Sequence, residues 1–236
     1  MGVAIISGGG IYNEGATATI SIVSANEGYS FSHWTGASSG SESPLNLTID
    51  SDLSVTANFA LNQYLLTVNS GSGGTVSESG NFAHGEAATI SATPDNGYIF
   101  AGWSGTGIAD PNSAETTVEM NETKTVSASF SLNQYSLTLL TGEGGSVTGE
   151  GNFSHGSNAL IEAIPDTGYS FAGWSGDGVT DANNSSSMVR MTQARSVSAT
   201  FSLNAYPLSL SAENGGGVSG AGNFAHGSFA SITAIP

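Results

Sequence analysis

The fold is decided by a nine-residue stretch that occurs twice and differs only at its third residue. Residues 97–105 read Gly-Tyr-Ile-Phe-Ala-Gly-Trp-Ser-Gly, and residues 168–176 read Gly-Tyr-Ser-Phe-Ala-Gly-Trp-Ser-Gly. The aromatic side chains carry a large apolar area, and the glycines on both sides permit close packing. One small core needs one such cluster, so each copy predicts a separate core.

A repeat of 71 residues surrounds this stretch. Matching residues follow one another at that spacing in three sets: Tyr64, Tyr135 and Tyr206; His84, His155 and His226; Phe59, Phe130 and Phe201. A fixed period of this size indicates tandem modules. We predict four modules, at residues 1–60, 61–131, 132–202 and 203–236, of which the first lacks its opening strand and the fourth is truncated.

The sequence begins and ends inside a module. Pro236 occupies the place of Pro94 and Pro165, and residues 12–15 correspond to residues 82–85 one copy later. A natural gene product rarely starts and stops in mid-module. We therefore expect the sequence to be a window on a longer repeat protein.

Within one copy the apolar residues have the period of two that is typical of strands. Such alternations run through residues 64–68 and 88–92, and Pro94 ends the second because proline cannot continue a central strand. Residues 118–120 and 126–130 are expected to form a closing hairpin. Because no stretch has a helical period, each copy predicts a small, mostly antiparallel β domain of five or six strands.

The modules are small and closely joined. Domains of about 70 residues without disulfides are near the lower limit for a single core. Only four residues separate Phe130, at the end of one copy, from Tyr135, at the start of the next. Such short linkers restrict relative motion and let neighbours share surface, as in nearest-neighbour repeat arrays.

Composition excludes several classes of function. The 236 residues include 3 Lys+Arg and 19 Asp+Glu, for a net charge of −16. Such a chain has no basic patch for nucleic acid or for an anionic membrane surface. Hydrophobic residues make up 38%, which is too apolar for a disordered acidic tail. The absence of cysteine excludes disulfides, thiolate zinc sites, iron–sulfur clusters and thiol nucleophiles.

No targeting or membrane segment is apparent. The sequence has no run of about 20 apolar residues, which crossing a bilayer requires. Residues 1–7 lack the basic and long apolar regions of a secretory signal. A signal, if one exists, is expected upstream of this sequence.

The repeated motif resembles a known family. Its pattern is Pro-x-x-Gly-Tyr-x-Phe-x-Gly-Trp followed by Val-x-Met and Val-Ser-Ala-x-Phe, and it is similar to the divergent internalin-type B-repeat, also called the Listeria-Bacteroides or bacterial repeat domain. The resemblance covers essentially the whole chain. It implies β-grasp-like modules, in which a short helical turn can replace a loop, in tandem on secreted and surface proteins of bacteria. The first copy departs from the pattern at Ser24 and His33.

The repeated histidines invite a metal interpretation. His84, His155 and His226 occupy one position, each followed by glycine, and the first copy has Glu14 there. One imidazole per copy, with no companion ligand at suitable spacing, is not a transition-metal site. We interpret these histidines as turn residues that hydrogen-bond to backbone.

The repeated tryptophans allow two interpretations. Trp34, Trp103 and Trp174 could form a row of aromatic platforms that binds a glycan with avidity. The alternative, which we favour, makes each tryptophan the centre of its module's core.

An acidic loop and the abundant serines complete the candidates. Asp177 and Asp181 lie four residues apart, loosely like a calcium loop, but no bidentate Glu follows, and the second copy keeps only Asp110. We interpret the loop as polar surface and expect calcium to be dispensable. No serine lies in a nucleophile elbow. We assign no catalytic, cofactor-binding or metal residue and expect no enzyme activity and no cofactor.

The sequence therefore predicts a non-catalytic stalk or spacer from a large secreted or cell-surface bacterial protein, with an adhesin as the favoured parent. Two alternatives stay open: a glycan-binding repeat module, and a subunit of an extracellular filament formed by head-to-tail strand exchange. The expected partners are the neighbouring repeats, a second copy head to tail, and a glycan or another surface protein. Nucleic acid and membrane insertion are not expected.

Overall fold

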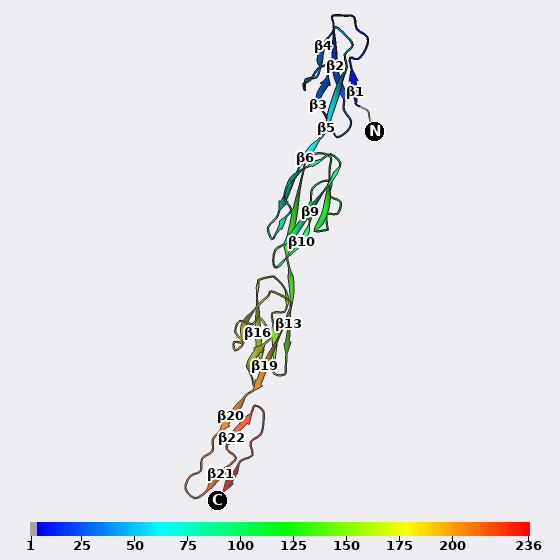
Figure 1. Ribbon diagram of the computed structural model, residues 1–236. Coiled ribbons are helices and arrows are strands. Elements are labelled where there is room, and N and C mark those ends of the chain that lie inside the picture. Colours follow the sequence, from blue (N-terminus) through cyan, green and yellow to red (C-terminus); the bar gives the residue numbers. More distant parts are fainter. Residues whose placement is uncertain (1–3) are drawn as a thin grey trace. The chain divides into compact units, whose positions relative to one another are not determined.

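The structure is a computed structural model that describes residues 4–236 (Figure 1). These residues form strands, turns and loops and contain no helix, which confirms a mainly β fold of small, mostly antiparallel sheets. The short helical turn that the resemblance implied is not found among them. The chain divides into two compact units, residues 1–131 and 132–236, which are described separately below.

The second module contains seven strands, whereas the sequence predicts five or six. They are β6 (Gln63–Ser70), β7 (Gly74–Val76), β8 (Gly80–Ala83), β9 (Glu86–Pro94), β10 (Tyr98–Ser104), β11 (Glu115–Met120) and β12 (Lys124–Leu132). The prediction of five or six strands was too low. Because β7 and β8 span only three and four residues, they are too short to reveal a period in the sequence.

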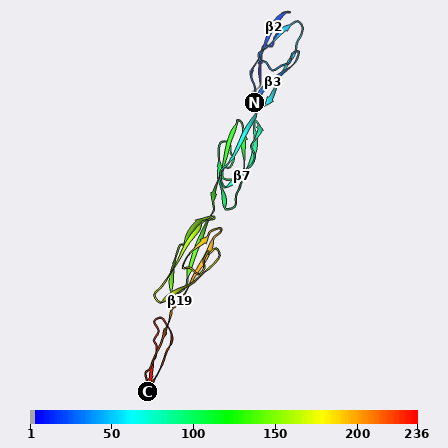
Figure 2. The same cartoon turned by 90° about the vertical axis from the view of Figure 1, so that its left-hand side faces the viewer.

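These strands form two sheets that pack face to face (Figure 2). One sheet has the order β10-β12-β6-β8, and the other has the order β11-β9-β7. The first and last strands of the module, β6 and β12, are parallel neighbours, with Leu66 opposite Lys124 and Val68 opposite Val126. This pairing closes the module, because it joins its two ends in one sheet.

The predicted closing hairpin is wrong. β11 pairs with β9, whereas β12 pairs with β6 and β10, so the two strands lie in different sheets. Residues 121–123 therefore cross from one layer to the other. A period of two and a short connection are compatible with either arrangement, because neither says which sheet a strand joins.

A β-bulge explains the spacing of the aromatic motif. In a regular strand, residues three apart point to opposite faces. In the third module, however, Phe171 pairs with Phe201 while Gly173 pairs with the preceding residue, Thr200. The extra residue between them shifts the phase of the strand. Trp174 consequently packs against Phe171, with 5.6 Å between the ring centroids. Gly173 has a φ of +156°, a backbone conformation that favours glycine.

The third module repeats this plan in the second unit. Its strands are β13 (Gln134–Thr141), β14 (Gly145–Thr148), β15 (Gly151–Ser154), β16 (Asn158–Pro165), β17 (Tyr169–Ser175), β18 (Ser186–Arg190) and β19 (Arg195–Leu203). The parallel pair is again formed by the first and last strands, β13 and β19. The second and third modules have separate hydrophobic cores made of equivalent residues, as the two copies of the motif predict.

The first and fourth modules contain fewer strands. The first has β1 (Ile5–Ser7), β2 (Ala16–Ser24), β3 (Tyr29–Gly36), β4 (Leu45–Ile49) and β5 (Val55–Leu61), arranged in sheets β1-β2-β4 and β3-β5. No counterpart of β6 lies among residues 4–61. The fourth has β20 (Ala205–Leu208), β21 (Gly217–Ser219), β22 (Gly222–Ala225) and β23 (Thr233–Ile235), in two pairs, β20-β22 and β21-β23.

Candidate functional site at the module joints

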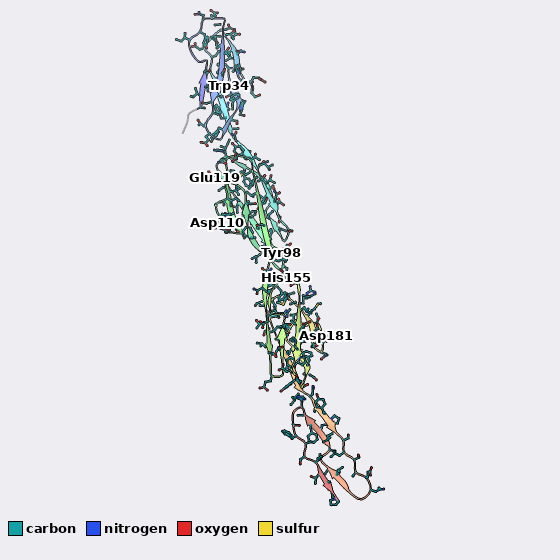
Figure 3. All side chains as sticks on the ribbon, turned by 180° about the vertical axis from the view of Figure 1, so that it is seen from behind. Trp34, Tyr98, Asp110, Glu119, His155 and Asp181 are labelled. Carbon is teal, nitrogen blue, oxygen red and sulfur yellow. The ribbon has the colours of Figure 1, made fainter. Side chains whose placement is uncertain are left out.

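The tryptophans lie in the module cores. Trp34, Trp103 and Trp174 are 1%, 6% and 5% exposed, and Figure 3 labels Trp34 among the strands of the first module. Each indole also donates its Nε1–H to a backbone carbonyl: to Glu42 at 2.9 Å, Ser113 at 3.1 Å and Asn184 at 3.0 Å. The core interpretation is confirmed. The platform interpretation is wrong, because a buried indole cannot stack on a sugar at the surface.

His84 lies where the second module meets the first. It follows β8 in a tight turn, as predicted, but its imidazole packs against Gly28, in the turn before β3 of the first module. A Cβ added to Gly28 would lie 2.1 Å from Cδ2 of His84, and Gly28 has a φ of +77°. Glycine is therefore required for two reasons, because both the backbone conformation and the imidazole exclude a side chain.

A continuous path of backbone hydrogen bonds crosses the same place. The Asn62 N–H donates to the Gly28 carbonyl at 2.7 Å, and the His84 N–H donates to the Asn62 carbonyl at 2.9 Å. Asn62 is the linker residue between β5 and β6. Its N–H bonds to the first module and its carbonyl bonds to the second, so the linker is held by both modules.

Side chains of Asn62, Ser30 and Tyr64 complete the contact. Ser30 Oγ donates to Asn62 Oδ1 at 2.6 Å, and Asn62 Nδ2 donates to the Tyr64 hydroxyl at 3.4 Å. The Tyr64 ring then packs edge-on against His84, with 6.0 Å between the centroids. We call Gly28, Ser30, Asn62, Tyr64 and His84 the first joint.

The second unit contains the same arrangement between the third and fourth modules. Its members are Gly168, Ser170, Asn204, Tyr206 and His226, which we call the last joint. The Asn204 N–H donates to the Gly168 carbonyl at 2.8 Å, and the His226 N–H donates to the Asn204 carbonyl at 2.7 Å. Ser170 Oγ donates to Asn204 Oδ1, and a Cβ on Gly168 would lie 2.1 Å from His226 Cδ2. The joint is therefore a repeated structure.

The start of the third module carries the same residues. The His155 N–H donates to the Asn133 carbonyl at 2.8 Å, Asn133 Nδ2 donates to the Tyr135 hydroxyl at 3.2 Å, and the His155 and Tyr135 rings are 5.9 Å apart. Nδ1 of His155, like that of His84, is buried without a hydrogen-bond partner. Packing therefore holds these imidazoles, whereas the predicted backbone hydrogen bond is made by the main-chain N–H.

The joint asparagines were missed in the sequence. Asn62, Asn133 and Asn204 recur with the 71-residue period, inside Leu-Asn-Gln-Tyr in the first two cases and Leu-Asn-Ala-Tyr in the third. A linker asparagine has no signal of its own, because polar residues are ordinary in short connections. Its strict recurrence together with the histidines was the available signal.

Asp181 of the acidic loop and its equivalent Asp110 each accept a hydrogen bond from a backbone N–H of the same loop. Asp110 Oδ1 accepts the Asn112 N–H at 2.9 Å, and Asp181 Oδ1 accepts the Asn183 N–H at 3.0 Å (Figure 3). Asp177 is exposed. Within residues 4–236, no three His, Asp or Glu side chains are grouped to hold a metal ion.

A protein cation already lies beside this loop. Arg195 packs on Gly178, where an added Cβ would lie 2.7 Å from Cζ, and its Nε donates to the Arg190 carbonyl at 2.8 Å. In the second module, Lys124 takes the same place and donates Nζ to the Glu119 carbonyl at 2.6 Å. A resident positive charge raises the electrostatic cost of binding a second cation there.

Three comparisons with known proteins extend these observations. A family model described as the divergent InlB B-repeat domain matches residues 3–63, 64–134, 135–205 and 206–236. Each match after the first begins three residues beyond the predicted module boundary. A search of curated proteins and a search of solved structures returned no match. No helix in the described residues is long and apolar enough to cross a membrane. Four tandem matches cover nearly every residue, and the chain therefore belongs to the divergent InlB B-repeat family.

Proposed function

We propose that this chain is a non-catalytic spacer of a secreted or cell-surface bacterial protein, with joints that resist bending between the first and second modules and between the third and fourth modules. The first joint is the observation that carries the proposal. Spacing two parts of a protein requires that the segment between them keep its shape, and a joint that fixes the linker on both sides serves that purpose. Membership of a surface-repeat family supports the extracellular location.

The contacts of the joint are strong enough to oppose free rotation. The path through Asn62 includes two backbone hydrogen bonds and the two side-chain bonds to Ser30 and Tyr64. Each is worth about 0.5 to 1.5 kcal/mol. Opening the joint would break several of them together, whereas a flexible Gly/Ser linker has no such contacts to lose.

The side chains that could bind or react are engaged in the fold. The indoles are buried in the cores, the imidazoles pack at the module ends, and Asp110 and Asp181 accept backbone N–H groups. This use supports a non-catalytic role. It also removes the aromatic platform on which the glycan-binding alternative rested.

The charge of the chain suits a surface spacer. A net charge of −16 with 3 basic residues gives copies of the chain the same strong sign. Like charges keep proteins soluble and disfavour association. A spacer that must remain extended among many copies on a surface gains from this repulsion. Adhesin is the parent protein that we favour.

Label-to-label distances test the proposal. Because the chain has no cysteine, cysteines introduced at the exposed residues Thr17 in β2 and Thr89 in β9 would be the only attachment points for spin labels. Pulsed electron resonance then measures the distribution of distances between the first and second modules. We expect a single narrow distribution, because the first joint holds both modules.

Matched variants identify the cause of the narrow distribution. Asn62→Gly removes the side-chain bridge, and His84→Ala removes the imidazole that packs on Gly28, so both should broaden the distribution at least twofold. His33→Ala, which removes an exposed imidazole of the first module, should leave it unchanged. A broad distribution in the unmodified chain, or no change in the joint variants, would contradict the proposal.

A further inference from the structure

The second module carries a modification motif that the proposed spacer function does not use. Residues 119–123 read Glu-Met-Asn-Glu-Thr. An asparagine followed two residues later by serine or threonine is the acceptor for N-linked glycans on exported proteins. Many bacterial oligosaccharyltransferases also require an acidic residue two positions before the asparagine. Here Glu119 is the acidic residue, Asn121 is the acceptor and Thr123 supplies the hydroxyl group.

Two further segments of the chain have the same pattern. They are residues 150–154, Glu-Gly-Asn-Phe-Ser, and residues 181–185, Asp-Ala-Asn-Asn-Ser. The acceptor asparagines Asn121, Asn152 and Asn183 occupy different places in the 71-residue repeat, so none of them is a copy of another. The fold decides which of the three an enzyme can reach.

The segment around Asn121 is a connection between strands. It crosses from one sheet of the second module to the other. The ladder of β11 ends at Met120, which pairs with Glu86, and the parallel ladder of β12 begins at Lys124, which pairs with Leu66. The three residues between them lie outside both ladders, and all three side chains are exposed. This segment can therefore enter an active site without the loss of a strand pairing.

The residues on either side hold the connection at the surface. Met120 is fully buried, and Lys124 is buried with its Nζ bonded to the Glu119 carbonyl at 2.6 Å. The side chain of Glu119 is exposed, and Figure 3 labels it in the second module. The carboxylate, the acceptor amide of Asn121 and the hydroxyl are thus all in solvent, on a segment whose two ends are fixed in the core.

The segment around Asn152 is held in a strand. Asn152 lies in β15, which pairs with β13. Ser154 Oγ accepts a hydrogen bond from Gln134 Nε2 at 2.8 Å, and Glu150 Oε1 accepts the Leu139 N–H at 3.4 Å. Both recognition groups are therefore engaged in the fold. Glycosylation of Asn152 would require β15 to leave its sheet.

The segment around Asn183 is closed by hydrogen bonds. Asp181 Oδ1 accepts the N–H of Asn183 itself at 3.0 Å, so the acidic residue of the motif is already bonded. The next carbonyl, that of Asn184, accepts the buried indole N–H of Trp174 at 3.0 Å. Ser185, which carries the hydroxyl, is half-buried. This segment is therefore tied to the core of the third module.

We propose that Asn121 is an N-glycosylation site, to which a bacterial oligosaccharyltransferase transfers a glycan from a polyprenyl-diphosphate donor. Asn121 Nδ2 forms a bond to the anomeric carbon of the first sugar, and the bond from that carbon to the diphosphate oxygen breaks. The polyprenyl diphosphate leaves with the electron pair, and one proton of Nδ2 passes to solvent. This site rests on the extracellular location in the proposed function, because such enzymes act outside the cytoplasm.

The site lies beside the first joint. The Met120 carbonyl accepts the Gly85 N–H at 2.8 Å, and Gly85 directly follows the histidine of that joint. A glycan on Asn121, being bulky and soluble, would shield the nearby linker from proteases. Asp50 and Thr192 occupy the equivalent positions in the first and third modules, so the glycan marks the second module alone.

Mass spectrometry of the intact protein tests the proposal. The folded 236-residue chain is incubated with a purified bacterial oligosaccharyltransferase and a polyprenyl-diphosphate-linked oligosaccharide. We expect one added glycan per chain, which fragmentation should place on Asn121. Synthetic peptides of residues 117–125, 148–156 and 179–187 should all accept the glycan, because outside the fold only the motif matters.

Matched variants of the whole chain separate the motif from exposure. Asn121→Gln should abolish the transfer, whereas Glu119→Gln and Thr123→Ala, which keep the acceptor, should each slow it at least tenfold. Asn112→Gln removes an exposed asparagine that has no hydroxyl residue two positions later, and it should change nothing. Because all four side chains are exposed, the variants should keep the amide spectrum of the parent chain away from the substitution.

Three results would overturn the proposal. They are no transfer to the folded chain, equal transfer to the Glu119→Gln or Thr123→Ala variant, and transfer to Asn152 or Asn183 of the folded chain as fast as to Asn121. The spacer proposal is judged by the label distances, which do not require a glycan. A failure of either proposal can therefore be recognised separately.

Discussion

The first and second modules share a scaffold, but two strands of the second, β6 and β8, have no counterpart strand among residues 4–61. The ladder between β2 and β4 has the same register as that between β9 and β11, and within residues 4–236 an opening strand is described beside the second ladder and not beside the first. In the described residues, the register is therefore the same with and without an adjacent opening strand. Burial does depend on it, because Val118, Met120 and Val126 are fully buried while their counterparts in the first module are not.

The same strand also connects the modules. β6 begins at Gln63, directly after Asn62, and its Tyr64 packs against His84 in the first joint. Its later residues Leu66 and Val68 fill the core. One strand thus completes the core of its module, and the start of the same strand takes part in the joint with the preceding module. A tandem array is a natural setting for such an element, because each neighbour interface is formed as a module closes.

The largest expected effect on stability comes from removing the core tryptophan that both modules share. Trp103→Ala should destabilise the second module by about 3 to 5 kcal/mol, the usual range for deleting a large buried aromatic side chain. Amide hydrogen exchange of β9 and β11 measures the loss, and Trp34→Ala tests the same position in the first module. A Trp103→Ala chain that keeps its stability but loses binding to a glycan would restore the platform interpretation.

A smaller effect is expected from making the second module resemble the first. Leu66→Ala removes a buried core side chain that has no counterpart among residues 4–61, and it should destabilise the second module by about 2 to 5 kcal/mol, toward the lower end if the site collapses. Hydrogen exchange at Val118 and Val126 should then approach that at Leu47 and Val55.

The matched control for Leu66 lies on the same strand. Leu65 is 45% exposed and points to the opposite face. Leu65→Ala should change stability by no more than about 0.5 kcal/mol, as is usual for surface substitutions. Equal losses from the two substitutions would show that β6 stabilises the module through its backbone pairing and not through the core.

The smallest expected effect is that of calcium, which should not change the stability of either module. The acidic loop changes between copies, and Arg195 or Lys124 already lies beside it. Thermal unfolding with chelator and with millimolar calcium should therefore give the same midpoint. A saturable rise that Asp177→Asn abolishes would contradict this expectation, because a ligand that prefers the folded state must stabilise it.

The sequence predicted elements better than it predicted their pairing. Alternation at residues 64–68 and 88–92 located β6 and β9, since one buried face imposes a period of two. The connection after Met120 was misjudged, because the partner of β12 is the distant strand β6. Such a pairing between the ends of a module depends on how the two sheets close, which local patterns do not encode.

The candidate site was predicted only in part. Trp103 was placed correctly, since its aromatic neighbours and glycines describe a core. His84 was placed in a turn, but its contact with Gly28 was not foreseen, because the two residues belong to different modules. A contact between modules leaves no periodic signal within either one.

The claim that the first and second modules are held in a fixed orientation is tested most directly by ¹⁵N relaxation of the unmodified chain. If the first joint holds, the amides of β2 and β9 should report one common rotational diffusion tensor. A reference chain with Gly-Ser-Gly-Ser inserted after Asn62 should give separate, shorter correlation times for the two modules. Separate short correlation times in the unmodified chain, equal to those of the reference, would contradict the account.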